Sequence, residues 1–425
     1  MTAPRHTVDI HRHTTRLNRQ DITWALGLYG TAIGAGVLFL PITAGIGGLW
    51  SLLAIALLAF PVTFFSHRAL TRFVLSGSDT DRNITDVVER HFGPRAGVIF
   101  TLLYFFAIFP ILLVYSVAIT NTMLDILQYQ LHITPPPRAL VSLVLIAGLI
   151  GVARGGEQRV VKAMSYLVYP FIAALAILSL ILIPSWSSAF FTTPMPDNGP
   201  HHAITSLWLA LPVLVFAFNH SPIISAFAIE QRQRYGDDAD RRSTHILVCA
   251  HLLMVATVLL FVFSCVLSLT PDNLAEAKAD NITILSYLAR HFHTPAIGIA
   301  APLIALVAIA KSFLGHYIGA REGAVGLIVH SRGRQVSSKA YRRLNDVAAI
   351  GMGIICWLVA TLDPSILGMI EQLGGPIIAA LLFLLPMIAI RKVPAMRRYA
   401  GRWSNVLVTV VGIMAVSATL SLFAS

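Results

Sequence analysis

Apolar positions dominate the chain in eleven long stretches that are separated by short polar links. We interpret each stretch as a transmembrane helix, because about 20 apolar residues cross a bilayer and longer helices tilt. This pattern predicts an all-α membrane protein. The predicted spans are residues 22–44, 48–72, 96–127, 139–154, 161–184, 204–229, 244–269, 296–328, 346–362, 365–390 and 404–423.

Two of these spans are interrupted in the middle of the hydrocarbon region. The first interruption is residues 30–37 (GTAIGAGV), and the second is residues 218–222 (FNHSP), about 185 residues later. Irregular backbone at membrane depth is costly unless protein buries it or it lines a cavity. Broken helices in corresponding positions of two halves therefore indicate the binding site of a transporter.

The two broken helices divide the chain into comparable halves. Spans one to five and six to ten pair as two five-helix units of opposite orientation, because five is odd, and this predicts an inverted repeat. The expected organisation is an N-terminal tail at 1–21 and a single transmembrane domain at 22–425. That domain comprises repeat one at about 22–184, repeat two at about 204–390 and an additional helix at about 404–423. We predict a surface helix from Ile84 to Phe92 in the link 73–95, and we expect an outer loop with a short helix in the link 270–295.

Composition supports the membrane class. The chain is 56% apolar and 12% charged, against roughly 25% charged in soluble domains. The net charge of +11 does not indicate nucleic acid, since the basic residues recur between apolar stretches. Of 31 lysines and arginines, Arg138, Lys278 and Arg290 fall in outer links and Lys311 lies inside a span, which leaves 27 on the other side. The positive-inside rule then predicts a cytoplasmic N-terminus and a C-terminus on the outer side.

Several classes of function are excluded by missing features. The three cysteines lie in apolar stretches with no CxxC spacing, so no metal or cofactor is expected. No phosphate-binding GxxxxGK[ST] loop or HExxH motif occurs, which argues against an ATPase or a membrane enzyme. A channel would need an open polar pore. Uphill transport would then use an ion gradient.

The first break offers backbone donors. Gly34 and Gly36, with Thr31 and Ala35 beside them, are expected to unwind the helix and to present amides to a substrate carboxylate. The alternative is that the Gly30/Gly34 pair only permits close helix packing.

The second break offers carbonyl groups and polar side chains. Pro222 removes an amide hydrogen and leaves carbonyls near Phe218 and Asn219 without helical partners, which suits an ammonium group or a cation. Asn219, His220 and Ser221 offer neutral groups for a substrate hydroxyl. A proline kink stabilised by a neighbouring helix is the alternative.

Span eight places one lysine near the membrane midplane. Lys311 shares a helical stripe with Gly315, Gly319 and Gly323, where another helix can approach closely. A charge at this depth costs about 2.5–3.5 kcal/mol on the insertion scale, so it indicates function. Burial disfavours the charged form and makes reversible protonation possible; the alternative is a structural ion pair with Glu371.

Three further groups stay open at this point. Glu371 is followed by Gly374, Gly375 and Pro376 and is a candidate gate or proton site, whereas His316 is expected to be a packed, hydrogen-bonded residue. Span three offers Tyr104 and Tyr115, and the spacing does not decide which of them faces the cavity.

Four runs are similar to bacterial serine transporters of the hydroxy and aromatic amino acid permease family. They are residues 28–48 (LYGTAIGAGVLFLPITAGIGG), 214–225 (LVFAFNHSPIIS), 311–323 (KSFLGHYIGAREG) and 364–377 (PSILGMIEQLGGPI). The similarity extends from about residue 20 to the C-terminus.

The resemblance implies eleven spans with a LeuT-type core, helices one and six broken, in a bacterial inner membrane with a periplasmic C-terminus. It implies proton-coupled import of L-serine, with L-threonine as a second substrate. Residues 31–36 and 218–221 would hold the amino acid. Lys311 and Ser312 would stand where sodium-coupled relatives hold a cation, and a proton on Lys311 would take its place. An aromatic amino acid permease and a sodium-coupled symporter are the alternatives, and the oligomeric state stays open.

Overall fold

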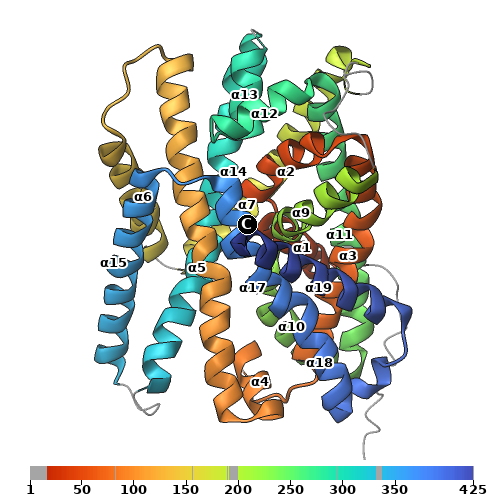
Figure 1. The fold of residues 1–425 in the computed structure, drawn as a ribbon. Coiled ribbons are helices and arrows are strands. Elements are labelled where there is room, and N and C mark those ends of the chain that lie inside the picture. Colours follow the sequence, from red (N-terminus) through yellow and green to blue (C-terminus); the bar gives the residue numbers. More distant parts are fainter. Residues whose placement is uncertain are drawn as a thin grey trace, which may run out of the picture.

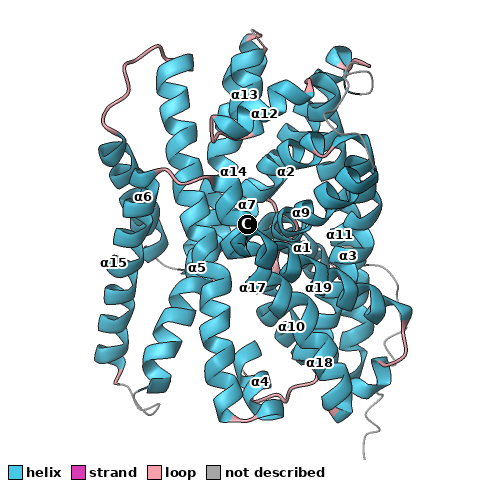
Figure 2. Ribbon diagram, viewed as in Figure 1, coloured by secondary structure: helices cyan, strands magenta, loops and turns pink. Residues whose placement is uncertain are grey.

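The computed structural model describes residues 17–81, 83–155, 157–188, 190, 200–292, 294–331 and 337–424. The predicted tail at 1–21 therefore lies mostly outside the described residues. Within them the chain is helical, with loops between the helices and no strand (Figure 2).

The observed helices follow the predicted spans. The broken span 22–44 corresponds to α1 (Arg19–Ala32) and α2 (Ala35–Ile46), and the broken span 204–229 to α9 (Pro200–Ala217) and α10 (Ser221–Tyr235). The other nine predicted spans correspond to α3 (Gly48–Leu75), α5 (Pro94–Asp125), α6 (Arg138–Arg154), α7 (Glu157–Leu182), α11 (Ala239–Ser268), α14 (Pro295–Ser331), α15 (Ser338–Leu362), the series α16 (Ile366–Met369) to α18 (Leu385–Lys392), and α19 (Trp403–Ala424).

Seven helical segments of the described chain are long and apolar enough to cross a membrane, and the bent pair α1–α2 makes eight. The chain is thus a multi-span helical membrane protein, and the total of eleven spans stays a prediction.

Both predicted breaks are present. α1 and α2 meet at Ile33 and Gly34 with a bend of 59°, and residues 218–220 separate α9 from α10. The first break is narrower than the glycine pattern suggested, because α1 continues as a helix past Gly30 to Ala32.

The long helix α5 packs along α14, as the glycine stripe on span eight predicted (Figure 1). A Cβ atom at Gly319 would lie 3.1 Å from Ile108, and one at Gly323 would lie 3.2 Å from Phe105. Small residues therefore let the two helices approach closely.

Short helices cover the two ends of the helix bundle. α4 (Ile84–Phe92) is the surface helix predicted in the link 73–95. The link 270–295 forms two helices, α12 (Pro271–Ala279) and α13 (Ile284–His291), at the opposite end from α4 (Figure 1). α12 lies against α2, where Leu274 occupies the space beside Gly45.

A polar cluster at Asp21 joins the start of α1 to α10 and α11. The Asp21 carboxylate accepts hydrogen bonds from Tyr235 at 2.8 Å and from the Arg242 guanidinium. Asn18, which caps α1, donates to the Tyr235 hydroxyl at 2.8 Å. The Asp21 side chain is only 1% exposed, so this cluster fixes the start of α1 against α10 and α11.

We expect Asp21→Asn to lower the melting temperature of the detergent-solubilised protein. The change removes the charged acceptor of the ion pair between Asp21 and Arg242, a loss of about 1–3 kcal/mol. Asp79→Asn is the matched control, because the Asp79 side chain is 91% exposed beside Arg232 and such pairs contribute little. Equal melting temperatures for the two variants would contradict this role of Asp21.

Candidate functional site at the helix breaks

The N-terminus of α2 presents free backbone donors at the first break. Gly34 precedes the helix in an extended conformation, and no side chain caps α2. The Gly34 carbonyl accepts only the Val37 amide, at 3.2 Å. The buried amides of Ala35 and Gly36 therefore face the break at the positive end of a helix dipole, where a carboxylate is stabilised.

Close contacts explain why glycines occupy this break. A Cβ atom at Gly34 would clash with the Ser312 hydroxyl and would lie 2.8 Å from the Tyr115 hydroxyl. A Cβ atom at Gly36 would lie 2.8 Å from the Ala217 Cα atom, at the end of α9. The two breaks are therefore in direct contact, because Gly36 of the first packs against the last turn before the second.

Side chains from other helices complete the first break. The Ser312 hydroxyl, on α14, donates to the freed Ile33 carbonyl at 2.9 Å. Thr31, a predicted substrate residue, instead donates to Gly27 within α1 at 2.9 Å. The Tyr115 hydroxyl, on α5, lies at this break beside Gly34.

The second break satisfies much of its own backbone. The Asn219 side chain accepts the Ser221 amide at 3.1 Å, and the His220 ring donates through Nδ1 to the Phe218 carbonyl at 3.0 Å. The His220 amide donates to Nε2 of His67, on α3, at 3.3 Å. Asn219 and His220 thus have a structural role at the break, which the sequence interpretation had considered for Asn219 but not for His220.

Free polar atoms remain at the second break. The Asn219 side-chain nitrogen is buried and has no hydrogen-bond partner among the described residues. Asn219 and Ser221 line a small cavity of about 10 Å³ with Tyr104, enough room for about one water molecule. Tyr104 and Tyr115 therefore lie at different breaks.

Lys311 lies beside the first break, and no described residue forms an ion pair with it. Its side chain is 1% exposed, and within the described chain its Nζ atom makes no hydrogen bond. Nζ lies 5.0 Å from the centre of the Phe171 ring, a cation–π distance, and 3.7 Å from a Cβ atom built at Gly30. The alternative of an ion pair between Lys311 and Glu371 is not observed.

Glu371 and His316, the other predicted residues, do not belong to either break. Glu371 belongs to the π-helical turn Ile370–Gly374 and interacts electrostatically with Lys278 of α12. His316 donates through Nδ1 to the Ser312 carbonyl at 2.8 Å and packs against the Tyr115 ring, so it is a hydrogen-bonded packing residue. The structure therefore gathers the two breaks, Tyr115, Lys311 and Ser312, with Glu371 at the periphery.

Comparison with known proteins identifies the family. The model of the tryptophan/tyrosine permease family matches residues 22–416. The chain belongs to this family. It is 59% identical to the serine transporter SdaC of Escherichia coli K12 over 403 residues, which cover 94% of each protein. The Shigella flexneri serine transporter SdaC is 58% identical over the same length and coverage. Membership of a permease family makes the chain a transporter rather than an enzyme.

Solved structures share the fold at low sequence identity. A mutant of the manganese transporter of Eremococcus coleocola matches with a TM-score of 0.60 and 16% identity, covering 95% of this chain and 85% of that one. MhsT in complex with L-phenylalanine matches with a TM-score of 0.58 and 16% identity, covering 96% and 98%. The permease thus has a LeuT-like helical fold, and at this identity the match informs on fold alone.

We expect Gly36→Ala to abolish amino acid uptake while the protein still inserts into the membrane. The added methyl group would meet the Ala217 backbone, so the two breaks would have to separate. Gly27→Ala is the control, because its methyl group would lie 4.0 Å from its nearest neighbour, Ile223. Uptake by the Gly36→Ala permease at the level of the Gly27→Ala permease would refute the close packing of the breaks.

Proposed function

We propose that this permease imports L-serine, with L-threonine as a second substrate, by proton symport across the bacterial inner membrane. The observation that supports this most strongly is the contact between the two helix breaks. The first break has an uncapped helix N-terminus that packs against the end of α9, with Lys311 beside it, and the second break has an Asn219 side-chain nitrogen with no hydrogen-bond partner among the described residues. The similarity to proteins named as serine transporters supports the choice of substrate.

The proposed fold is a LeuT-type 5+5 inverted repeat of eleven spans in a single domain. Repeat one is about 22–184 and repeat two about 204–390, with the helix at about 404–423 outside the repeat. The two breaks support this pairing because each interrupts the first span of its half. The positive-inside rule supports a cytoplasmic N-terminus and a periplasmic C-terminus.

In the proposed complex the α2 amides of Ala35 and Gly36 bind the serine carboxylate. The carbonyl groups at the second break accept hydrogen bonds from the ammonium group, since a helix end leaves carbonyls without helical partners. The Asn219 side-chain nitrogen binds the hydroxyl, because it is a buried donor that needs an acceptor.

A small substrate suits this packing better than an aromatic one. Gly36 is in van der Waals contact with α9, and the cavity beside Asn219 and Ser221 has the volume of about one water molecule. The family description names aromatic amino acids, so an aromatic amino acid permease is the second candidate. Such a substrate would require the breaks to separate.

Lys311 is proposed to carry the coupled proton. Its ammonium group is buried against Phe171 and beside the Ser312–Ile33 bond, and no carboxylate of the described residues compensates its charge. Uncompensated burial favours loss of the proton. Opening of the site to water reverses that preference, so each cycle would load and release one proton. Glu371 is a second candidate for this path, and a sodium-coupled symporter is the alternative.

We expect alanine to compete poorly with serine for uptake. Alanine lacks the hydroxyl and would leave the Asn219 donor buried and unpaired, a loss of about 1–3 kcal/mol, or roughly 5-fold to 150-fold in affinity. Competition of unlabelled alanine against radiolabelled serine measures this ratio. Equal competition by the two amino acids would rule out hydroxyl recognition.

Lys311→Ala should eliminate proton-driven accumulation of serine while serine exchange continues. The measurement is uptake into proteoliposomes under an imposed proton gradient, with and without a sodium gradient. Lys339→Ala is the control, because Lys339 lies on the exposed first turn of α15. Accumulation driven by sodium alone, or an unimpaired response of the Lys311→Ala protein to the proton gradient, would reject this mechanism.

A further inference from the structure

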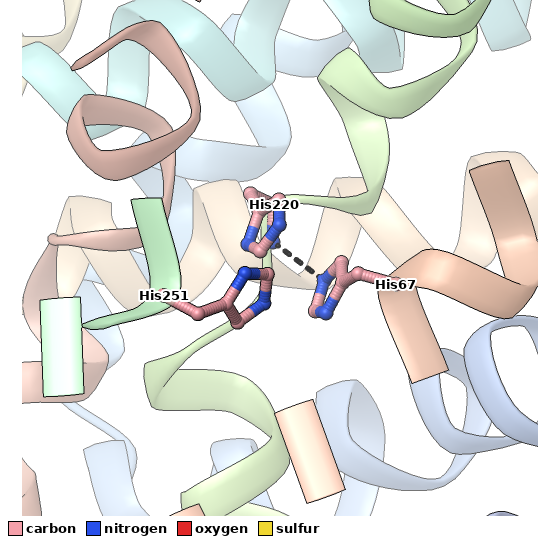
Figure 3. A group of neighbouring side chains, drawn as sticks. All are labelled: His67, His220 and His251. Atoms are coloured by element: carbon pink, nitrogen blue, oxygen red, sulfur yellow. Dashed lines mark hydrogen bonds between the residues drawn. The ribbon is translucent and has the colours of Figure 1, made fainter. Parts of the chain in front are cut away.

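Three histidines, two from helices and one from the second break itself, meet beside that break (Figure 3). His67 lies on α3, His220 precedes α10, and His251 lies on α11, and all three are fully buried. One ring nitrogen of each lies within 4.8 Å of those of the other two. His67 and His251 have no part in the substrate site described above.

Backbone carbonyls fix the orientation of all three rings. Nδ1 of His67 lies 2.7 Å from the Thr63 carbonyl, and Nδ1 of His251 lies 2.7 Å from the Leu247 carbonyl. His220 uses the Phe218 carbonyl in the same way. A carbonyl only accepts, so each Nδ1 carries the hydrogen and each neutral ring keeps its lone pair on Nε2.

The cluster therefore contains three acceptors, which are the Nε2 atoms of the rings, and one donor, which is the backbone amide of His220. Nε2 of His67 accepts the backbone amide of His220 at 3.3 Å. Nε2 of His220 and of His251 are buried and have no hydrogen-bond partner in the described part of the chain. Unpaired buried acceptors are costly, so this arrangement favours the binding of a cation between them.

The geometry favours a proton over a metal ion. The His67 and His220 rings are stacked, with centroids 3.5 Å apart and planes 7° apart (Figure 3). A metal ion bonds to a ring nitrogen at about 2.0 Å along its in-plane lone pair, and two nearly parallel planes do not meet at one ion. The plane of the His251 ring is inclined by 55° to that of His67 and by 61° to that of His220. A proton on Nε2 of one ring can therefore point toward the Nε2 lone pair of a neighbouring ring.

The surroundings limit the cluster to one proton. Among the described ionisable groups, those that act on His67 and His220 are the other imidazoles, and Phe64 packs against His251.

The charged groups on the packed helices have other contacts. Arg68 lies over the rings of Phe64 and Phe65, Arg72 pairs with Asp240, Asp21 pairs with Arg242, and Lys311 lies over Phe171. A second proton would place two positive charges on imidazole rings that are in contact, and these charges would repel each other.

We propose that the histidine cluster is a one-proton site that controls the second helix break during transport. This proposal rests on the proposed function, because it adds a proton-sensitive element to the same cycle. In the neutral cluster, His67 accepts the His220 amide and holds the start of α10 against α3. A proton on Nε2 of His67 turns that acceptor into a donor, breaks the bond and releases the start of α10. His67 is thus a positioning residue that acts through His220.

The test compares serine exchange by proteoliposomes that have the same pH on both sides, between about pH 5 and pH 8, the range in which an imidazole usually titrates. Equal pH removes the driving force that Lys311 is proposed to use. We expect wild-type exchange to rise several-fold as the pH falls. His67→Gln keeps an acceptor for the His220 amide but has no proton to gain, so its exchange should become independent of pH while its melting temperature is kept. His251→Gln should also flatten the profile.

Two controls separate this role from a packing role. His245→Gln should retain the wild-type profile, because His245 makes the same Nδ1 bond on α11 but is exposed. His67→Ala removes the acceptor and should lower the melting temperature, which His67→Gln should not do.

Failure of the one-proton site can be distinguished from failure of the proposed transport function. A wild-type pH profile in the His67→Gln protein, or wild-type exchange that does not depend on pH, would overturn the one-proton site even if Lys311 carries the coupled proton. Inhibition by Zn²⁺ that both glutamine variants abolish would replace the proton with a metal ion. If the wild type exchanges no serine, the proposed function fails, and the same comparison is made with the amino acid that it does exchange.

Discussion

The arrangement of this permease depends on one constraint, which is that backbone groups freed by a broken helix must find partners inside the membrane. Water is absent there, and each unpaired group costs several kcal/mol. The two breaks meet this constraint in opposite ways. The second satisfies much of its backbone with Asn219, His220 and the His67 ring, whereas the first leaves the α2 amides without a side-chain cap.

That difference assigns different parts to the two breaks. The α2 amides are free for a ligand, and the close packing of Gly34 and Gly36 sets the size of what fits between the helices. The second break is bonded to α3 through one side chain, His67, which accepts the His220 amide. Polar groups on α5 and α14 approach the first break, and this places Tyr115, Ser312 and Lys311 around it.

The sequence predicted the helices and the breaks because membrane thickness and the chemistry of glycine and proline act locally. The spans, the surface helix Ile84–Phe92 and the buried Lys311 all follow from such local signals. The capping roles of Asn219 and His220 could not be predicted in this way, because they depend on which carbonyl or amide a side chain reaches after folding. The choice between Tyr104 and Tyr115 required the packing of α5 against its neighbours.

The histidine cluster shows the same limit more sharply. His67 and His251 each occur alone in an apolar span, and a lone histidine on a helix gives no signal of its partners. Only the packing of α3, α10 and α11 brings the three rings together. A search for buried histidines near predicted breaks would have found His220, but not the two residues that complete the cluster.

The central claim is that the two breaks together hold one amino acid, and a structure of the permease with bound L-serine tests it most directly. We expect the serine carboxylate within hydrogen-bond distance of the Ala35 and Gly36 amides and the serine hydroxyl at the Asn219 side chain. Serine bound away from the α2 N-terminus, with those amides making no contact to it, would contradict this claim.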